Sequence, residues 1–528
     1  MNELFRLSRR PAVQSAAYYE QGWWRRETFL DDLHSWARTA ADQSAYVNVR
    51  RHGAETATVT FGELADWVER LAGVLWSCGV RPGDAVAFQL PNLWEAAALW
   101  LACGRVGTVA VSLPPWAARR ERDLVLSATR PGLIVTTDDA GVDGCETMDV
   151  ITLRDLLCRA RSAAKIPVAE RPQVHADDVC QVLCSSGTTG RPKAVAHTFN
   201  TRYAGARAVA AQVSAGAVTA TAGDLTHSLG LVRNLLSPLV TGRPSVFLSS
   251  YDPDDWLDVL ERHRVNSFSS TPLVLGELVC AQRQRPRDLS SLQQVISTGA
   301  PIPARIAAGV RECLTSRLVN SFGMTESGLV LNSSPETDRA EDTLGRPVLG
   351  FEVRKMENAE PARLRVRGPG LCCVMFDLRT GTVVWDASRD EGWYDTGDLV
   401  RQDEHGCLRY VTRVDERIGS GNMIPVVEVE GELMEHPAVA EVAIVGVPDQ
   451  EGHETACAVI VPRGTAPALE NLRDFLSGRH MSEEFLPTCV AVAATLPRTP
   501  MGKIRKAEIR RQIADGTLVT FGHLRASR

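Results

Sequence analysis

The sequence predicts an α/β protein with a large N-terminal domain, β-rich in its final part, and a small mobile α+β C-terminal domain. At 528 residues the chain is too long for one hydrophobic core, so we expect at least two domains. Over the first ~400 residues, helix-like stretches alternate with short apolar runs, a pattern typical of buried and largely parallel strands covered by helices. After that point strands alternate with hairpins, and a shorter mixed unit follows.

The alternation is carried by three helix-like stretches and six apolar runs. Apolar periodicity predicts helices over 61–78, 94–106 and 256–263. Turn signals flank the apolar runs, which predicts that each run is a strand. These runs are AVAFQL (85–90), LIVTT (133–137), VCQVLC (179–184), SVFLS (245–249), LQQVIS (292–297) and RLVNSF (317–322).

The pattern changes from Phe351 onward, where we expect the large domain to become β-rich and to end at residue 412. LVRQ and CLRYVTR lie on either side of the turn residues 403–406, which is typical of a hairpin. Residues 413–528 are then expected to form the small domain. Its predicted strands are VAEVAIVGVP, TACAVIVP and CVAVAAT, and its predicted helices lie around 428–435, 469–476 and 506–514.

Composition and charge exclude several kinds of partner. A net charge of -6, from 58 basic and 64 acidic residues interspersed along the chain, leaves no basic footprint for nucleic acid or an anionic membrane. The N-terminus MNELFRLSRRP lacks the apolar core of a secretion signal, and the most apolar stretch, 96–114, is interrupted by Arg105. The 13 cysteines include no CxxC pair and are interpreted as small buried hydrophobes. We therefore expect a cytoplasmic protein.

A run of hydroxyls, glycines and one lysine, SSGTTGRPK at 185–193, has the composition of a phosphate-binding loop. It is not a Walker A loop, because Gly187 and Gly190 are too close together and Pro192 precedes Lys193. The glycines let backbone N–H groups turn toward an anion. Hydroxyl donors are supplied by Ser185, Ser186, Thr188 and Thr189. A polar surface loop between a strand and a helix is the alternative interpretation.

Lysine is rare in this chain, since only five of the 58 basic residues are lysines. Lysine and arginine are not interchangeable, because lysine carries a compact charge on a flexible stem. Lys193 and Lys503 both lie inside motifs. Their rarity therefore favours a specific role for each.

Six segments together resemble the adenylate-forming (ANL) superfamily of acyl-CoA synthetases, adenylation domains and luciferases. The resemblance covers nearly the whole chain and keeps the family's order, which makes a chance match implausible. Among the branches of the family, NMIPVVEVE at 422–430 most resembles stand-alone ligases that act on aryl and cyclic carboxylic acids. The six motifs are SSGTTGRPK (185–193), STGAPIP (297–303), NSFGMTESG (320–328), GWYDTGD (392–398), RVDER (413–417) and PRTPMGK (497–503).

The resemblance implies a site for ATP. The 185–193 loop would hold the phosphates, and Asp398 would bind the ribose hydroxyls with help from Arg413, although a Thr-Gly-Asp turn and a surface arginine are the plain alternatives. Phe322 stands where the family usually has tyrosine, so stacking on adenine is kept and a phenolic hydrogen bond is lost. The adenine site implied by the family comprises Gly299, Ala300, Pro301, Asn320, Ser321, Phe322, Gly323 and Met324.

The resemblance also implies a magnesium ligand and two catalytic donors. Glu326 would bind Mg²⁺, which prefers a carboxylate together with phosphate oxygens and waters, and Thr325 would donate to the α-phosphate. Lys503 would bridge the substrate carboxylate and the α-phosphate. The plain alternatives are a carboxylate in the first turn of a helix for Glu326 and a solvated loop lysine for Lys503.

The acid is expected to lie beside THSLG at 226–230. Amino-acid-activating relatives carry an aspartate in this stretch and this chain has none there, which disfavours α-amino acids. An apolar pocket suits an aryl, cycloalkyl or short acyl acid. His227 is expected to be catalytic as well, with a packed core histidine as the alternative. The predicted pocket residues are His227, Ser228, Leu229, Leu231, Ser269, Thr298 and Gly299.

The resemblance does not fix the acceptor of the acyl group, just as it does not fix the acid. The resemblance implies that residues 413–528 rotate about Asp415 and bring a pantetheine tunnel, formed by Gly419, Ser420 and Gly421, to the site. The segment departs from the family pattern: it is one residue shorter before Gly421, and Thr412 replaces a glycine. Coenzyme A is the expected acceptor. A direct transfer to an amine, giving an amide, is the second hypothesis, and a non-catalytic nucleotide-binding relative is the third. No carrier-protein segment is recognised, so we expect a stand-alone monomer or homodimer.

Overall fold

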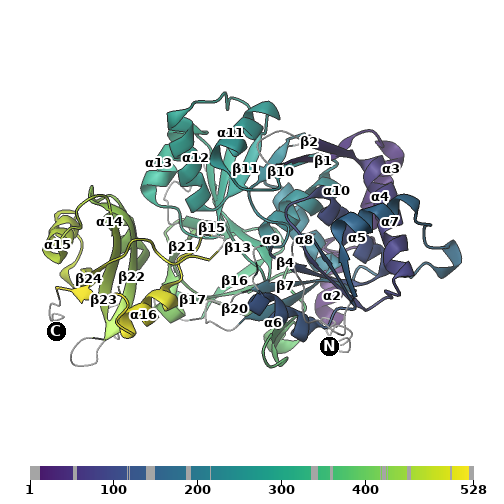
Figure 1. Cartoon of the computed structure of the whole chain (residues 1–528). Coiled ribbons are helices and arrows are strands. Elements are labelled where there is room, and N and C mark those ends of the chain that lie inside the picture. The colour runs from purple at the N-terminus through teal and green to yellow at the C-terminus, as the bar shows by residue number, and fades with distance from the viewer. Residues whose placement is uncertain are drawn as a thin grey trace.

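The protein has a large layered α/β body with a smaller α+β unit at one end (Figure 1). Three sheets organise the chain, two in the large body and one in the small unit. The computed structural model describes residues 12–50, 56–115, 117, 119–137, 149–185, 192–214, 216–334, 343–356, 361–416, 418, 424, 426–448, 454–499 and 502–522.

One sheet of the large body has eight strands in the order β19-β18-β8-β7-β4-β3-β5-β6. Strands β3 to β7 pair in parallel, as the apolar runs predicted, whereas β7 and β8 are antiparallel. The predicted phosphate loop therefore joins two antiparallel strands rather than a strand and a helix. The strands are β3 (Ala85–Gln89), β4 (Val109–Leu113), β5 (Leu133–Thr136), β6 (Asp149–Thr152), β7 (Val179–Ser185), β8 (Lys193–Thr198), β18 (Val374–Asp377) and β19 (Val383–Asp386).

The second sheet has thirteen strands in the order β16-β17-β20-β21-β15-β14-β13-β12-β11-β9-β10-β1-β2. Strands β1, β10, β9, β11, β12 and β13 are parallel, and pairing becomes antiparallel at β14, earlier in the chain than the predicted change at Phe351. The strands are β1 (Ser44–Val49), β2 (Thr56–Thr60), β9 (Thr219–Thr221), β10 (Ser245–Leu248), β11 (Ser267–Ser270), β12 (Gln294–Thr298), β13 (Leu318–Met324), β14 (Gly328–Asn332), β15 (Thr343–Pro347), β16 (Glu352–Lys355), β17 (Ala362–Arg367), β20 (Tyr394–Gln402) and β21 (Leu408–Arg413).

The helices of the large body pack on these sheets and agree with the predicted stretches. Helix α11 begins three residues earlier than predicted, because the Asp252 side chain caps it and Pro253 occupies its first turn. The helices are α2 (Ala12–Glu20), α3 (Phe29–Thr39), α4 (Phe61–Ser77), α5 (Trp94–Val106), α6 (Arg119–Thr129), α7 (Leu153–Ser162), α8 (Phe199–Ala210), α9 (Ser228–Gly230), α10 (Ser237–Thr241), α11 (Pro253–Arg262), α12 (Pro272–Gln284), α13 (Ala304–Cys313), the 3-10 turns η2 (Val168–Glu170) and η4 (Arg389–Gly392), and a π-helical segment, η3 (Leu231–Leu236).

The small unit has its own four-stranded sheet and its own core, as predicted. Val429, Leu433, Ile444 and Leu472 meet in that core and are almost fully buried. A short helical turn, η5 (Val414–Glu416), precedes the unit. Its elements are α14 (Val426–Met434), β22 (Val439–Pro448), β23 (Glu454–Pro462), α15 (Leu469–Gly478), η6 (Glu483–Phe485), β24 (Cys489–Val492), α16 (Lys506–Ala514) and β25 (Thr520–Phe521).

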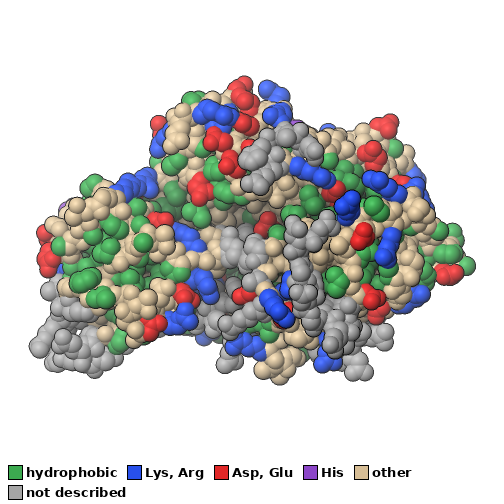
Figure 2. Space-filling model, viewed as in Figure 1, with side chains coloured by type: hydrophobic (Ala, Val, Ile, Leu, Met, Phe, Trp, Pro, Cys, Tyr) green, Lys and Arg blue, Asp and Glu red, His purple; other side chains and the backbone are tan. Residues whose placement is uncertain are grey.

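Charged side chains of both signs are interspersed over the face of the molecule shown in Figure 2. No single-sign patch dominates that face, in agreement with the even charge pattern of the sequence. Across the part of the chain that the structure describes, none of the helices combines the length and the apolar character needed to cross a membrane.

Trp256 provides a test of the packing beneath the thirteen-stranded sheet. Its side chain is 2% exposed, and its ring centroid lies 5.2 Å from that of Phe268 on β11. Trp256→Ala should lower the free energy of unfolding by about 3–5 kcal/mol, because it leaves a large cavity. Val168→Ala is the matched control, because Val168 is 78% exposed and its loss should change stability by less than about 0.5 kcal/mol. Equal denaturant midpoints for the two variants would contradict this packing.

Candidate active site

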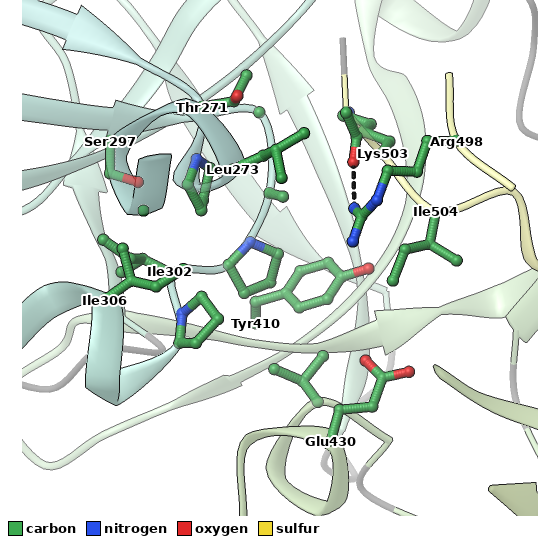
Figure 3. A pocket seen from close by; sticks show the side chains of 18 of the residues that line it. Thr271, Leu273, Ser297, Ile302, Ile306, Tyr410, Glu430, Arg498, Lys503 and Ile504 are labelled. Carbon is green, nitrogen blue, oxygen red and sulfur yellow. Dashed lines mark hydrogen bonds between the residues drawn. The ribbon is translucent and has the colours of Figure 1, made fainter. Parts of the chain in front are cut away.

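A cleft of about 2280 Å³ separates the small unit from the large body. Both parts of the chain contribute to its walls, and it collects most of the residues that the sequence motifs singled out. Figure 3 shows part of this cleft, with Lys503 and Arg498 on one side and Thr271 and Ser297 on the other. The predicted site residues that line it are Lys193, His227, Gly299, Ala300, Pro301, Asn320, Ser321, Phe322, Gly323, Met324, Thr325, Glu326, Asp398, Arg413 and Lys503.

The loop that carries Lys503 is held by hydrogen bonds on both sides. The Thr499 N–H donates to the Lys503 carbonyl at 2.7 Å, and the Lys503 N–H donates to the Thr499 hydroxyl at 3.1 Å. Arg498 donates to the Gly502 carbonyl at 2.6 Å and to Glu441 at 2.7 Å. Gly502 has a φ of +80°, in the left-handed region that favours glycine. These contacts fix the loop before any ligand binds.

The Lys503 side chain crosses the cleft to the end of β12. A methyl group built on Gly299 would lie only 3.9 Å from Cε of Lys503. The protein atoms around the ammonium lower the pKa of Lys503, while the nearby carboxylates of Asp398 and Glu326 oppose the shift. Gly299 has a φ of +90°, so the turn at this point also requires glycine. Lys503 as a whole stays exposed to the open cleft, and its position beside Gly299 is what distinguishes it from other loop lysines.

Asp398 and Arg413 form a cross-strand pair at the floor of the cleft. They lie opposite each other on β20 and β21, and an Arg413 Nη lies 3.1 Å from the Asp398 carboxylate. Asp398 is 4% exposed, and its N–H donates to the Thr396 hydroxyl at 3.0 Å. Burial raises the pKa of Asp398, although Arg413 and Lys503 both oppose that shift. The hairpin predicted for β20 and β21 is thus what aligns this pair.

Thr325 and Glu326 lie in the turn between β13 and β14, and not in the first turn of a helix. The Tyr394 hydroxyl donates to the Glu326 carboxylate at 3.3 Å, and burial together with that carboxylate raises the pKa of Tyr394. His197 Nε2 lies 2.9 Å from the Thr325 carbonyl, so this nitrogen carries the proton. His197 was missed in the sequence, although it stands shortly after the 185–193 run.

The single carboxylate at this turn suits magnesium. Mg²⁺ is usually held in nucleotide sites by one or two carboxylates, with phosphate oxygens and waters completing the shell. In the described part of the chain, no group of three or more His, Cys, Asp or Glu side chains is arranged to hold a metal ion alone. Glu326 lines the cleft and accepts a hydrogen bond from Tyr394. It could therefore supply the one protein carboxylate of a magnesium site whose other ligands are phosphate oxygens and waters.

The ends of the predicted phosphate loop are described, whereas its centre is not. Ser185 at the end of β7 lies opposite Lys193 at the start of β8, so the hairpin returns the chain to the cleft wall. Lys193 also lies opposite Asp377 of β18. Ser186, Gly187, Thr188, Thr189 and Gly190 lie outside the described residues.

Residues 320–324 of the predicted adenine site form the C-terminal part of β13. A methyl group built on Gly323 would lie 2.6 Å from the Gly328 carbonyl, so only glycine fits where this strand approaches β14. The Asn320 N–H donates to the Ser333 hydroxyl at 2.8 Å, and the Ser321 hydroxyl donates to Asn332 at 2.7 Å. Phe322 is partly buried and lines the cleft, as stacking on a base requires.

His227 lines the cleft at the start of α9. Burial lowers the pKa of His227 to about 4, so the imidazole is neutral near pH 7. The Ser228 hydroxyl accepts a hydrogen bond from Arg202 at 3.2 Å, and Leu231 packs in the main hydrophobic core. Of the seven predicted pocket residues, His227 and Gly299 line the cleft, whereas Ser228, Leu229, Leu231, Ser269 and Thr298 do not.

A lysine that the motifs did not single out ties the start of the small unit to two of its helices. Lys506 of α16 lies 2.7 Å from Glu430 of α14 and 3.8 Å from Glu416 of η5. Burial raises the pKa of Glu430, and Lys506 opposes that shift. The rarity of lysine, applied to Lys503, would have identified Lys506 as well.

Sequence profiles of known families match both parts of this chain. The profile described as "AMP-binding enzyme" matches residues 33–375, and the profile described as "AMP-binding enzyme C-terminal domain" matches residues 428–503. The chain belongs to the AMP-binding enzyme family.

Known relatives of this AMP-binding enzyme match more than nine tenths of its length. The medium-chain fatty-acid–CoA ligase of Escherichia coli (strain K12) is 30% identical over 94% of this chain and 92% of its own. The feruloyl-CoA synthase of Amycolatopsis sp is 30% identical over 91% of this chain and 99% of its own. The solved structure of o-succinylbenzoate CoA synthetase from Bacillus subtilis, in complex with the acyl-adenylate intermediate OSB-AMP, matches with a TM-score of 0.81 at 26% identity, covering 92% of this chain and 98% of that one. The predicted family and fold class are therefore confirmed.

The acceptor side of this AMP-binding enzyme is only partly described. Gly419, Ser420 and Gly421, the predicted tunnel, lie outside the described residues. Ile418 on one side of that segment is buried in the core of the small unit. Those predictions therefore stay predictions.

The neutral state of His227 can be tested by titration. In protein labelled with ¹³C-histidine, the His227 imidazole signal, assigned by its loss in His227→Gln, should stay constant from pH 8 to about pH 5.5 and titrate near pH 4. Because the unfolded chain binds this proton near pH ~6.5, His227's contribution to stability is intact above that pH and is lost as the pH falls toward 4. His227→Gln should remove that part of the acid sensitivity. Titration of the assigned signal near pH ~6.5 would contradict the burial.

Proposed function

We propose that this AMP-binding enzyme activates a non-amino carboxylic acid with ATP and transfers the acyl group to coenzyme A. The observation that carries the proposal is the placement of Lys503. It enters from the small unit and lies beside Gly299, in a cleft that also holds Asp398 and Glu326. A carboxylate and a triphosphate repel each other, so a positioned cation between them is what this reaction needs most.

In the first half-reaction, a substrate carboxylate oxygen bonds to the α-phosphorus of ATP, and the bond to pyrophosphate breaks. Lys503 holds the carboxylate beside the α-phosphate, and the Thr325 hydroxyl donates to the same phosphate. Asp398 accepts hydrogen bonds from the ribose, with Arg413 fixing its carboxylate. Bound through Glu326, Mg²⁺ would neutralise charge on the phosphate oxygens. The 185–193 loop holds the leaving phosphates.

In the second half-reaction, the thiol sulfur bonds to the acyl carbon, and the bond to AMP breaks. The thiol proton must also be removed. His227 lines the cleft and is neutral, so its imidazole can accept a hydrogen bond from the thiol, but with a pKa of about 4 it is a weak base and the proton passes to solvent. The relatives named fatty-acid–CoA ligase and feruloyl-CoA synthase support coenzyme A as the acceptor.

We also propose that residues 413–528 form a lid that turns near Asp415 between the two half-reactions. Lys506 contacts Glu416, which lies beside that position, and Glu430 within the small unit. This contact ties the start of the small unit to its helices α14 and α16. Because all three residues follow Asp415, a rotation at Asp415 would carry them together, move the Lys503 loop out of the cleft and bring the 418–430 segment toward it.

Two further features support this assignment. The stretch 226–230 has no aspartate to pair with an α-ammonium group, which supports an aryl, cycloalkyl or short acyl acid. Every described cysteine is a free thiol, which supports a reducing compartment and therefore the cytoplasm.

The proposal is tested by exchange of labelled pyrophosphate into ATP with a panel of carboxylic acids. At least one aryl, cycloalkyl or short acyl acid should support exchange, and exchange should stop when Mg²⁺ is chelated. The preformed acyl-adenylate is then offered to coenzyme A or to a panel of amines, and the products are weighed by mass spectrometry. An acyl thioester supports the proposal. An amide product would show that the acceptor is an amine and not coenzyme A. ATP binding without any exchange would contradict the assignment as an enzyme.

Lys503→Ala should reduce acid-dependent pyrophosphate exchange by about 10²- to 10³-fold, because a positioned charge is lost from the transition state. Lys165→Ala is the matched control, since Lys165 is a partly exposed lysine that pairs with Asp66 far from the cleft. The control should exchange at the wild-type rate. Near-normal exchange by Lys503→Ala would show that Lys503 does not act in this half-reaction.

A further inference from the structure

His197 is a buried histidine to which the proposed mechanism gives no part. It stands on β8, four residues after Lys193, and is 0% exposed. Both ring nitrogens of a buried imidazole need partners, because an unpaired buried polar group costs free energy. Nε2 lies 2.9 Å from the Thr325 carbonyl, and Nδ1 lies 3.0 Å from the Thr201 hydroxyl. The imidazole therefore bridges two segments that lie far apart in the sequence.

The Thr201 end of this bridge belongs to a rigid helix start. Thr201 lies in the first turn of α8, where its hydroxyl accepts a hydrogen bond from the Thr198 N–H at 3.0 Å. The Thr198 hydroxyl accepts in return from the Thr201 N–H at 3.2 Å. These reciprocal bonds form a capping box, which satisfies the first N–H groups of the helix. His197 directly precedes Thr198, so the end of β8, the cap and the imidazole are held together.

The other end of the bridge is the turn that carries two residues of the proposed site. Thr325 and Glu326 both line the cleft. The strand register shifts at residues 322–323, so the pairing of β13 with β14 is irregular just before this turn. Within the turn, the Ser327 N–H donates to the Met324 carbonyl at 3.2 Å. That bond closes the turn but does not use the Thr325 or the Glu326 carbonyl.

Both of these carbonyls are bound by segments of the eight-stranded sheet. The Thr325 carbonyl accepts from the His197 imidazole, and the Glu326 carbonyl accepts from the Cys372 N–H at 2.7 Å. Cys372 lies just before β18, which pairs with β8. Neither contact uses the Thr325 hydroxyl or the Glu326 carboxylate. Of the two contacts, only the one from His197 is made by a side chain, so it is the one that depends on residue type.

We infer that His197 is a positioning residue for the first half-reaction. Its imidazole holds the turn so that the Thr325 hydroxyl reaches the α-phosphate and the Glu326 carboxylate reaches Mg²⁺. The inference rests on the proposed function, because it assigns a role within the proposed site. His197 is buried and does not line the cleft, so it acts through the turn and not on the ligands. A displacement of the turn by about 1 Å is enough to lower the rate by about 10²-fold.

Two amide substitutions separate the contributions of the two ring nitrogens. His197→Gln places an amide N–H near the position of Nε2 and keeps a donor for the Thr325 carbonyl. His197→Asn places its amide near Nδ1 and keeps only the contact with Thr201. In acid-dependent pyrophosphate exchange, His197→Asn should lower kcat by about 10- to 100-fold, and His197→Gln should stay within about 5-fold of wild type. KM for the acid should stay close to the wild-type value in both, because the turn acts on the phosphates.

Amide hydrogen exchange, measured without ATP or Mg²⁺, shows whether the turn itself has loosened. The Ser327 N–H binds the Met324 carbonyl and the Cys372 N–H binds the Glu326 carbonyl, so these two amides report on the turn. Both should exchange hydrogen faster in His197→Asn, by up to about 10-fold, the factor that one lost hydrogen bond allows. Both should stay protected in His197→Gln.

Thr60→Ala is the matched control for a general loss of stability. Thr60 caps α4 through its own capping box and does not line the cleft. Its substitution should lower the denaturant midpoint, while kcat and both reporter amides stay as in wild type. If His197→Asn does not fold, His197→Leu, which fills similar space without either nitrogen, replaces it. If neither folds, ¹⁵N-histidine NMR of wild-type protein decides, because an unprotonated Nε2 at His197 overturns the inference and a protonated one supports it.

The inference requires the loss of kcat and the faster hydrogen exchange of the turn to occur together. It is overturned if His197→Asn lowers kcat while both amides stay protected, or loosens the turn while kcat is unchanged. Wild-type behaviour of His197→Asn in both measurements overturns it as well. The proposed function fails in a different way, since wild-type protein would then support no pyrophosphate exchange with any acid.

Discussion

The charge interaction between the Lys503 ammonium and the carboxylates of Asp398 and Glu326 spans the cleft between the small unit and the large body. Asp398 is buried and paired with Arg413, so its position is set by the strand register of β20 and β21. The position of Lys503 is restricted by Arg498, which donates hydrogen bonds to the Gly502 carbonyl and to Glu441. Each partner is thus fixed within its own folding unit. The interaction then depends on how the two units meet.

The ion pairs at the start of the small unit bear on the proposed rotation of that unit. Lys506 bridges Glu416 and Glu430, so one cation holds the start of the small unit against its own helices. Ion pairs of this kind are weakly stabilising overall, because the cost of removing charges from water offsets much of their attraction. A contact that is specific in geometry but modest in net energy is compatible with the proposed rotation.

A buried polar network around Arg233 follows a different logic. Arg233 donates to Gln212, and the hydrogen bonds among Gln212, Ser321 and Asn332 connect η3 to β13, which also carries residues 320–324 of the predicted adenine site. A rigid sheet positions side chains more precisely than loops do, because neighbouring strands restrict each backbone. The cost of a buried polar network is acceptable when nearly every member has a partner.

Much of this protein could be predicted from the sequence, because its signals are local. Apolar periodicity located α5 and α16 to the residue, and the motifs that resemble the family singled out Lys503, Asp398 and Glu326, all of which line the cleft. Other features depend on contacts between distant segments. The pairing of β7 with β8, the hydrogen bond from His197 to Thr325 and the hydrogen bond from Arg233 to Gln212 join residues whose separation along the chain carries no periodic signal. Residue type and spacing thus determined the family and its motifs. Only the tertiary structure decided which of the predicted acyl-pocket residues reach the cleft and which are buried, because burial depends on the register of parallel strands and on the helix that covers them.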